Sequence, residues 1–366
     1  MTICFFGNYI MDYPRVRVLR QGFLENNIEV LECHTRARGF KKYLDLYQQH
    51  KKIKNKYNIL LVMMGGQTLV WFAKLVSSKK IIFDAFTSLY LTNIEDRKTC
   101  SAKSLKAYYY KFLDKISCQQ ADKILLDTNA QINYFVEKYN LDIKKFVRVF
   151  VSSDMNCHEK FYSSCHPDER KFASGKLSRD PDAEIGKKFI IHWHGYIVPF
   201  YGLETVIKSA KILENYKEIE FQIITRFNSK YDKIKKLAQE LNLENIKFYP
   251  ETGYKEINNF INNSDICLGI FGNNKKAQVV IPNKIYEAVA CAKPVITADQ
   301  LVIREVFNEE SMVLIKPENP EELAEKILLL KNSQELKDKI ASNCYEIYEN
   351  KLLPKKIIKK LLGQLE

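Results

Sequence analysis

Short apolar runs alternate with longer helix-forming segments along most of the chain, and this alternation limits the folds that the chain can adopt. In the first half, the β-branched and aromatic runs that read as strands are residues 1–6, 28–32, 57–63, 80–84, 123–127 and 147–151. Segments of helical length and pattern separate these runs, as in βαβ units, which form parallel sheets. The alternation begins again at residues 189–193. The sequence therefore predicts an α/β protein built on parallel sheets.

The length of 366 residues suits about two domains, at roughly 100–200 residues each. Between the two alternating halves, residues 156–188 are polar, contain proline and show no periodicity, so they mark a domain boundary. We expect a first domain over residues 1–160, a second over 186–350, and a further amphipathic helix over 351–366.

Cysteine and charge patterns disfavour several classes of protein. The nine cysteines show no C-x-x-C spacing, which favours free thiols in a reducing cytoplasm over disulfides or zinc. His158 and His166, with Cys157 and Cys165 beside them, fit no zinc spacing either. Neither a secretory signal nor an apolar run of about 20 residues is present. The formal net charge of +13 comes without the signature of a nucleic-acid-binding module, so it favours anionic substrates or an anionic surface, or reflects a lysine-rich genome.

Residues 281–299 read as a loop, a short helix, a tight turn and a buried strand. Pro282 suits the first helical position, and Lys284 and Glu287 are neighbours on the polar face of the first turn. A helix N-terminus attracts phosphate. A lysine there can neutralise a second phosphate oxygen, and a carboxylate one turn deeper can accept both hydroxyls of a ribose. The set suits a nucleoside diphosphate, with a solvated Lys–Glu pair on a surface helix as the alternative.

The same stretch resembles the donor-site motif of retaining glycosyltransferases of family 4, which have the GT-B fold. The residues that carry the resemblance are Pro282, Asn283, Lys284, Glu287, Ala288 and the run 293–296. The resemblance implies two Rossmann-like domains whose parallel sheets face each other across a cleft. Residues 1–160 would then bind the acceptor, residues 186–350 would bind the nucleotide-sugar, and the helix at 351–366 would pack back on the first domain.

The resemblance also assigns roles on the donor side. The later glutamate of the family's E-x7-E pair, which holds the donor ribose, matches Glu287, and the place of the earlier one holds Val279. Arg226 follows a predicted strand, where ligands of parallel sheets bind, and is our candidate for phosphate. Thr252, with Glu251, falls where members hold the nucleobase.

Two tyrosines depart from the family pattern. Tyr196 and Tyr201 stand where members commonly carry an arginine and a lysine that hold the diphosphate. A tyrosine hydroxyl can donate a hydrogen bond to phosphate but neutralises no charge. Tyr196 and Asn283 complete the predicted donor set.

The acceptor side is predicted from the first domain. Gly7 and Asn8 follow the first strand and let a backbone approach a ligand, or form a plain turn. Arg15 either binds an anion or begins a solvated helix. Asp84 ends a strand and is the candidate catalytic residue, facing the acceptor hydroxyl, with a helix N-cap as the alternative. Phe86 occupies the place where the family often carries a histidine.

We therefore expect a retaining, hexosyltransferase-type enzyme that moves a sugar from a nucleotide-diphosphate sugar, such as a UDP- or GDP-sugar, to a hydroxyl. No cofactor and no metal are expected, because Lys284, Arg226 and helix dipoles would meet the donor charge. The expected acceptor is an envelope glycan or lipid-linked precursor at the inner face of the cytoplasmic membrane. Lysines interleaved with aromatic residues over 103–112 point to an anionic membrane surface, or to an ordinary core-facing helix. The alternatives are a nucleotide-sugar epimerase and a degenerate GT-B scaffold or partner subunit.

Overall fold

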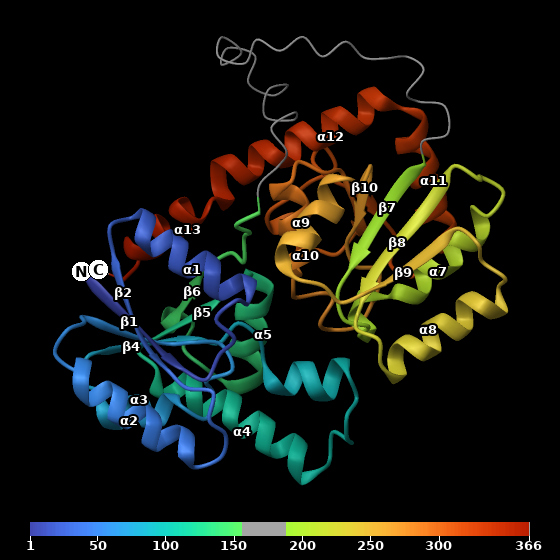
Figure 1. Cartoon of the computed structure of the whole chain (residues 1–366). Helices are drawn as coiled ribbons and strands as arrows, with labels where there is room; N and C mark the ends of the chain where they lie inside the picture. The colour runs from blue at the N-terminus through green and yellow to red at the C-terminus, as the bar shows by residue number, and fades with distance from the viewer. Residues whose placement is uncertain (156–187, 366) are drawn as a thin grey trace, which may run out of the picture. The chain divides into compact units, whose positions relative to one another are not determined.

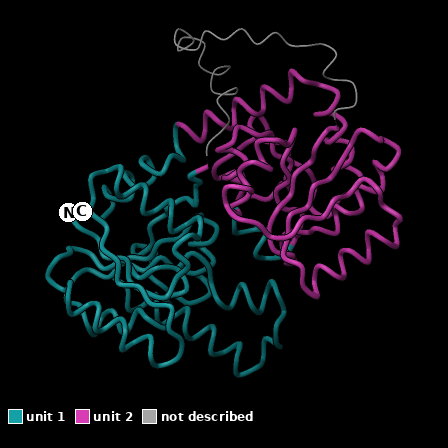
Figure 2. The backbone as a smooth tube through the Cα atoms, viewed as in Figure 1, with its two compact units in different colours: residues 1–154, 274–281, 350–366 teal, residues 155–273, 282–349 magenta. Residues whose placement is uncertain are grey.

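The computed structural model describes residues 1–155 and 188–365. The predicted linker at 156–188 falls almost wholly outside the described residues, as do His158, His166 and their neighbouring cysteines. The chain divides into two compact units (Figure 2). Unit 1 comprises Met1–Asp154, Asn274–Ile281 and Asn350–Glu366, and unit 2 comprises Met155–Asn273 and Pro282–Glu349.

Unit 1 is built on a six-stranded parallel sheet in the order β2-β1-β3-β4-β5-β6. The strands are β1 (Thr2–Gly7), β2 (Glu29–His34), β3 (Ile59–Val62), β4 (Lys80–Asp84), β5 (Lys123–Leu126) and β6 (Phe146–Arg148). The main helices are α1 (Pro14–Glu25), α2 (Lys41–Ile53), α3 (Val70–Val76), α4 (Leu105–Gln120), α5 (Asn129–Tyr139) and α13 (Pro354–Leu362).

The period-two pattern of β1 separates two cores on the two faces of this sheet. Ile3 and Phe5 join the core under α1 and α13, whereas Cys4 and Phe6 join the core under α2 to α5. In Figure 1, α1 and α13 lie on one face and α2, α3 and α4 on the other. Helix α13 packs so closely against α1 at Gly22 that a Cβ at this position would lie 2.4 Å from Ile358 Cγ1.

Residues 274–281 belong to unit 1 although they connect two elements of unit 2. Val279 is 3% exposed and packs in the core under α2 to α5, and its carbonyl accepts a hydrogen bond of 2.6 Å from Thr128 Oγ1. Asn274 Nδ2 donates to Asp96 Oδ1 at 2.8 Å. The valine that replaces the family's first motif glutamate is therefore a core residue, and a carboxylate would be poorly placed there.

Unit 2 repeats the architecture with the strand order β12-β11-β10-β7-β8-β9, again all parallel. The strands are β7 (Phe189–His194), β8 (Ile219–Thr225), β9 (Ile246–Pro250), β10 (Ile266–Leu268), β11 (Val295–Ala298) and β12 (Val313–Ile315). The main helices are α7 (Leu203–Ile212), α8 (Ser229–Glu240), α9 (Tyr254–Asn262), α10 (Asn283–Ala290), α11 (Pro320–Asn332) and α12 (Gln334–Ile347).

Backbone contacts explain two element boundaries in unit 1. Helix α3 begins only at Val70, because Gly65 has φ +79° and residues 66–69 close a turn in which the Leu69 N–H donates to the Gly66 carbonyl. The strand expected over 147–151 is limited to Phe146–Arg148, since the next carbonyls turn toward Arg15. None of the helices described is long and apolar enough to cross a membrane.

Candidate active site

The N-terminus of α10 and the end of β7 bring Glu287 and His194 together in unit 2. His194 Nε2 lies 2.8 Å from Glu287 Oε2, and the two side chains are 13% and 6% exposed. His194 Nδ1 in turn lies 2.9 Å from His192 Nε2, and His192 Nδ1 lies 3.4 Å from Gln222 Oε1 on β8. A hydrogen-bonded row therefore leads from the sheet interior to Glu287 and fixes the direction of its carboxylate.

His192 is the buried member of this row. Burial, followed by the neighbouring charge of His194, lowers the pKa of His192 well below its usual value. A neutral imidazole in that place can donate at one nitrogen and accept at the other. Sequence reasoning did not find this row, because the pairing of His194 with Glu287 spans 93 positions.

Lys284 lies one turn before Glu287 and its ammonium group is enclosed by aromatic rings. Its Nζ lies 3.6 Å from the ring centroids of both Trp193 and Tyr201. The side chain is 4% exposed, and Nζ has no hydrogen-bond partner among the described residues. The indole N–H of Trp193 is likewise a buried donor without a partner among them.

The enclosure has an electrostatic consequence for Lys284. Burial removes water from the ammonium and lowers its pKa well below the ordinary lysine value, against the opposing attraction of Glu287. Cation–π attraction to the two rings offsets part of the free-energy cost of removing the ammonium from water. A buried ammonium with no hydrogen-bonded acceptor among the described residues can gain strongly from a phosphate oxygen.

Gly195 makes room for this arrangement. It follows β7 with φ +135°, a backbone conformation that side chains rarely adopt. A Cβ there would lie 3.3 Å from Lys284 Nζ and 3.3 Å from Tyr201 Cε2. Glycine at this position lets the loop after β7 approach the lysine.

A second cation is held at the ends of β8 and β9. Arg226 Nε donates to Glu251 Oε2 at 2.6 Å, and its guanidinium carbon lies 5.0 Å from the Tyr196 ring centroid. The Tyr196 hydroxyl donates to Glu251 Oε1 at 2.8 Å. Partial burial opposes ionisation of Glu251, but the bonds from Arg226 and Tyr196 outweigh it and lower the pKa of that carboxyl. Arg226 itself is 56% exposed, so it stays open to solvent.

The structure thus brings the predicted donor residues together in two groups. Lys284 and Glu287 meet at α10, whose first residue is the half-buried Asn283, one position later than expected. Tyr196 and Arg226 meet at the ends of β7 and β8. Thr252 is half-buried directly after β9.

On the acceptor side, Arg15 and Asp84 form a buried ion pair. Arg15 Nη2 lies 2.9 Å from Asp84 Oδ1 and Nε lies 3.3 Å from Oδ2, with both side chains 0% exposed. Arg15 Nη1 donates to the carbonyls of Val149 and Phe150 at 2.8 Å. Arg15 therefore does not begin a solvated helix, because its guanidinium is buried against the carboxylate of Asp84. The predicted role of Asp84 at the acceptor hydroxyl stays a prediction. Asp84 caps no helix, since residues 85–88 are not helical.

Gly7 is the last residue of β1, one position beyond the predicted end of the strand, and Asn8 follows it. Gly7 has φ +147° and its carbonyl accepts from the Thr35 N–H at 3.1 Å. Asn8 is exposed, and its Nδ2 donates to the Ala37 carbonyl at 2.6 Å. The two residues join the loops after β1 and β2, and their contact with an acceptor stays a prediction.

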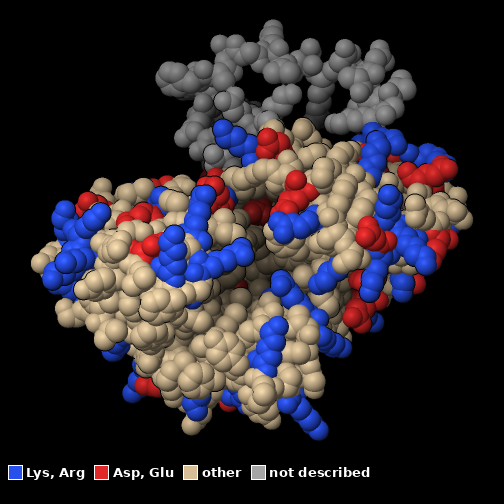
Figure 3. Space-filling view, turned by 60° about the horizontal axis from the view of Figure 1, so that its bottom comes forward, with Lys and Arg blue, Asp and Glu red and all other residues tan. Residues whose placement is uncertain are grey.

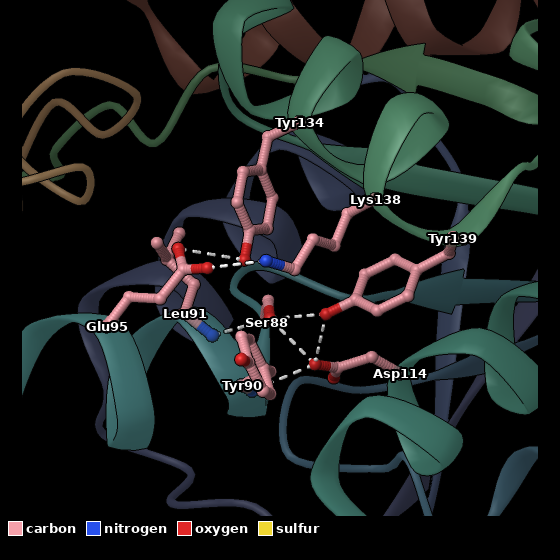
Figure 4. Close-up of polar contacts among 8 residues, drawn as sticks. All are labelled: Ser88, Tyr90, Leu91, Glu95, Asp114, Tyr134, Lys138 and Tyr139. Atoms are coloured by element: carbon pink, nitrogen blue, oxygen red, sulfur yellow. Dashed lines mark hydrogen bonds and ion pairs between the residues drawn. The ribbon is translucent and has the colours of Figure 1, made fainter. Parts of the chain in front are cut away.

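The segment after β4 is fixed by a buried carboxylate that the sequence did not reveal. Asp114, on α4, accepts hydrogen bonds of 2.6 Å from Ser88 Oγ, 2.9 Å from the Tyr139 hydroxyl and 3.0 Å from the backbone N–H of Tyr90 (Figure 4). It also accepts from the backbone N–H of Leu89 at 3.0 Å. Burial raises the pKa of Asp114, and these donors partly offset the rise. A carboxylate with this many donors holds the segment on α4 and α5.

A neighbouring contact extends this network. Glu95 accepts from Lys138 Nζ at 2.7 Å and from the Tyr134 hydroxyl at 3.1 Å, and both donors lie on α5 (Figure 4). Tyr90, Glu95, Tyr134 and Lys138 also line an open cavity of about 730 Å³ on unit 1. These contacts hold residues 88–95 against α4 and α5 on the surface of unit 1.

Comparison with known proteins shows which family this part of the chain is similar to. Residues 176–347 match the model of the family Glycosyl transferases group 1. The matched stretch contains β7 to β11 and α10, so the part of the chain that carries Lys284 and Glu287 is similar to that family. No curated protein matches the chain.

Similar solved structures extend over both units. HepE of Anabaena, solved in complex with UDP, has a TM-score of 0.69 at 13% identity over 100% of this chain and 99% of its own. Sucrose-phosphate synthase from Thermosynechococcus elongatus has a TM-score of 0.70 at 12% identity, covering 100% and 98%. TarM has a TM-score of 0.64 at 15% identity over 89% of this chain, which spans only 58% of TarM. These likenesses confirm the predicted fold class, α/β with two Rossmann-like units as in GT-B glycosyltransferases.

Proposed function

We propose that this protein is a retaining, metal-independent glycosyltransferase that transfers a sugar from a nucleotide-diphosphate sugar to a hydroxyl. The observation that carries the proposal is the caged ammonium of Lys284 beside the oriented carboxylate of Glu287 at the N-terminus of α10. Helix N–H groups and Lys284 suit the two phosphates, and Glu287 suits the ribose hydroxyls. The match of this half to the group 1 family supports the same reading.

The two tyrosine departures support an active site rather than a degenerate one. Tyr201 replaces a family lysine, yet its ring contacts the ammonium of Lys284. Tyr196 replaces a family arginine, yet its ring contacts the guanidinium of Arg226. Two basic side chains thus remain on the donor side, supplied from other positions. Both can stabilise the leaving diphosphate, whose developing charge governs the rate of transfer.

The donor and mechanism follow from the same groups. A UDP-sugar is the first choice, since HepE was solved with UDP-glucose, and a GDP-sugar is the second. With the leaving diphosphate held by Lys284 and Arg226, the acceptor hydroxyl attacks the face from which the nucleotide departs. The departing phosphate then takes the hydroxyl proton. We assign no proton transfer to Asp84, because its carboxylate is paired with Arg15 and is not exposed.

The proposed acceptor is a hydroxyl of an envelope glycan or of a lipid-linked precursor, met at the cytoplasmic membrane. The basic charge of +13 supports an anionic acceptor or surface.

A screen of UDP-, GDP- and ADP-sugars by thermal shift tests the donor assignment, with the matching free sugars as controls. One nucleotide class should raise the melting temperature, and the free sugars should not. NMR of the product formed from that donor and a glycan acceptor should show the anomeric configuration of the donor. An inverted configuration would refute the retaining mechanism, and the absence of any nucleotide-dependent shift would favour a scaffold.

A further inference from the structure

Three neighbouring helices of unit 1 expose an unusual number of large apolar side chains. Of the nineteen large hydrophobic residues exposed in the described part of the chain, nine lie on or at the start of these helices. They are Phe40, Leu44 and Tyr47 of α2, Trp71 and Leu75 of α3, and Leu105, Tyr108, Tyr109 and Phe112 of α4, called here the α2–α4 face. Leu105 is 90% exposed, and Phe40 and Leu75 are each 74% exposed.

The helices of the α2–α4 face lie side by side on one side of the sheet of unit 1 (Figure 1). Ring contacts join α2 to α3, because the Tyr43 ring lies 6.1 Å from that of Phe40 and 5.5 Å from that of Trp71. Lys74 of α3 donates to the carbonyl of Gln120, at the end of α4, at 3.3 Å. Figure 3, turned to bring the lower side of Figure 1 forward, shows a broad tan surface over unit 1 with lysine and arginine around it.

Core packing does not account for these side chains. The inner sides of the same helices already supply the core with Leu46, Val70, Phe72 and Cys118. The outer side of such a helix is normally polar. Single exposed apolar residues are ordinary, but a contiguous area marks an interaction surface.

The charge of the three helices identifies the partner. They carry eight lysines, at positions 41, 42, 51, 52, 74, 106, 111 and 115, against two carboxylates, Asp45 and Asp114. Asp114 is buried in the network of Figure 4, and Asp45 accepts a hydrogen bond from Thr35. The outward charge is therefore positive. A second copy of this chain would bring lysines against lysines, which disfavours self-association through this face.

We propose that the α2–α4 face docks on an anionic lipid bilayer. Tyrosine and tryptophan rings favour the headgroup level of a membrane, leucine and phenylalanine enter slightly deeper, and lysines reach the lipid phosphates with their long side chains. The docked unit is the one expected to bind the acceptor, so the inference extends the proposed membrane-linked acceptor. The donor site lies in unit 2 and does not depend on it.

Sedimentation with lipid vesicles tests the proposal on the full chain. The wild-type protein should sediment with vesicles of phosphatidylcholine and phosphatidylglycerol, and should stay in solution with phosphatidylcholine alone. Raising the salt from about 0.1 M to about 1 M shortens the screening length from ~10 Å to ~3 Å and should weaken binding. The triple variant Lys106→Gln, Lys111→Gln, Lys115→Gln should bind roughly a hundredfold more weakly, at about fivefold per lysine.

A matched charge control separates this face from the overall basic charge. Lys230→Gln, Lys233→Gln and Lys235→Gln remove three exposed lysines from α8 in unit 2 and should leave vesicle binding nearly unchanged. A second test variant, Trp71→Ser, Leu75→Ser, Phe112→Ser, keeps every charge and should also lose binding, because it removes the apolar contribution.

Three results would overturn the proposal. Wild-type protein that stays in solution with anionic vesicles at low salt removes the bilayer as partner. Equal losses in the α4 and α8 lysine variants would show that net charge alone binds the vesicles. A wild-type dimer in light scattering, dissociated by the serine variant while vesicle binding persists, would assign the face to self-association. Nucleotide-dependent thermal shifts, measured on the same variants, report separately on the donor site.

Discussion

Replacing Lys284 by methionine should weaken nucleotide binding while making the free protein more stable. Lys284 is 4% exposed and its ammonium has no hydrogen-bond partner among the described residues, so the free protein carries an unfavourable buried group. Methionine has similar length and no charge. Exchange of buried charges for apolar residues of similar size is neutral or stabilising by up to about 4 kcal/mol, and the two lost cation–π contacts, at about 0.5–2 kcal/mol each, reduce the gain.

The effect on ligand binding has the opposite sign. A hydrogen bond to a charged group contributes about 1.5–3 kcal/mol, so Lys284→Met should raise the Kd for the nucleotide by roughly ten- to 150-fold. The melting temperature of the free variant should stay level or rise by a few degrees, at about 2–4 °C per kcal/mol. A variant with lower stability and unchanged Kd would show that Lys284 is a structural residue, which would refute the reasoning.

Titration calorimetry in buffers of different ionisation enthalpy gives an independent check. Burial lowers the pKa of Lys284 in the free protein, and a bound diphosphate should raise it again, so binding should take up a proton from solution. Affinity should fall as the pH rises through the lowered pKa, and the uptake should grow over the same range. Because the folded-state pKa is below the unfolded one, the stability advantage of Lys284→Met should be full at low pH and vanish above the ordinary pKa of about 10.4. Equal proton uptake by wild type and variant at every pH would contradict this account.

Four further predictions follow from other residues. Glu287→Gln should raise the Kd for the nucleotide-sugar by about ten- to 150-fold, measured by calorimetry, with little change in melting temperature, since the amide still reaches His194. Val279→Glu, which restores the family residue, should destabilise by several kcal/mol in urea unfolding, because position 279 is 3% exposed in an apolar core; a neutral effect would contradict the placement. Asp84→Asn should cost about 3–5 kcal/mol of stability, because it leaves the buried guanidinium of Arg15 unpaired. The double variant Arg15→Met, Asp84→Leu should cost less, because it removes both charges, and an equal or larger loss would contradict a structural ion pair. Turnover should persist in excess chelator, and loss of activity that manganese or magnesium restores would refute metal independence.

The fold could be predicted because its determinants are local. Apolar runs followed by amphipathic segments identify βαβ units wherever they occur. The sequence pattern of β1 was clear because its alternate side chains are buried in the cores on both faces of the sheet, so the whole strand is apolar. Lys284 and Glu287 could be paired as candidates because they share one helical turn.

Contacts between distant positions could not be predicted in this way. The partners of Asp84 and Glu287 lie 69 and 93 positions away, so sequence reasoning could not predict that Arg15 and His194 contact these carboxylates. Tyr201 was interpreted as a lost charge, since nothing local shows that its ring would contact Lys284. Residue types and local spacing indicate which chemistry a side chain can perform, but its contacts with distant residues depend on the tertiary structure.

The most direct test of the donor site is a crystal structure of the protein with the nucleotide selected by the thermal-shift screen. The diphosphate should lie at the N-terminus of α10, with a phosphate oxygen within about 3 Å of Lys284 Nζ. Glu287 should accept from the ribose hydroxyls while keeping its contact with His194. A nucleotide bound elsewhere, or bound with no phosphate oxygen near Lys284 Nζ, would contradict the account.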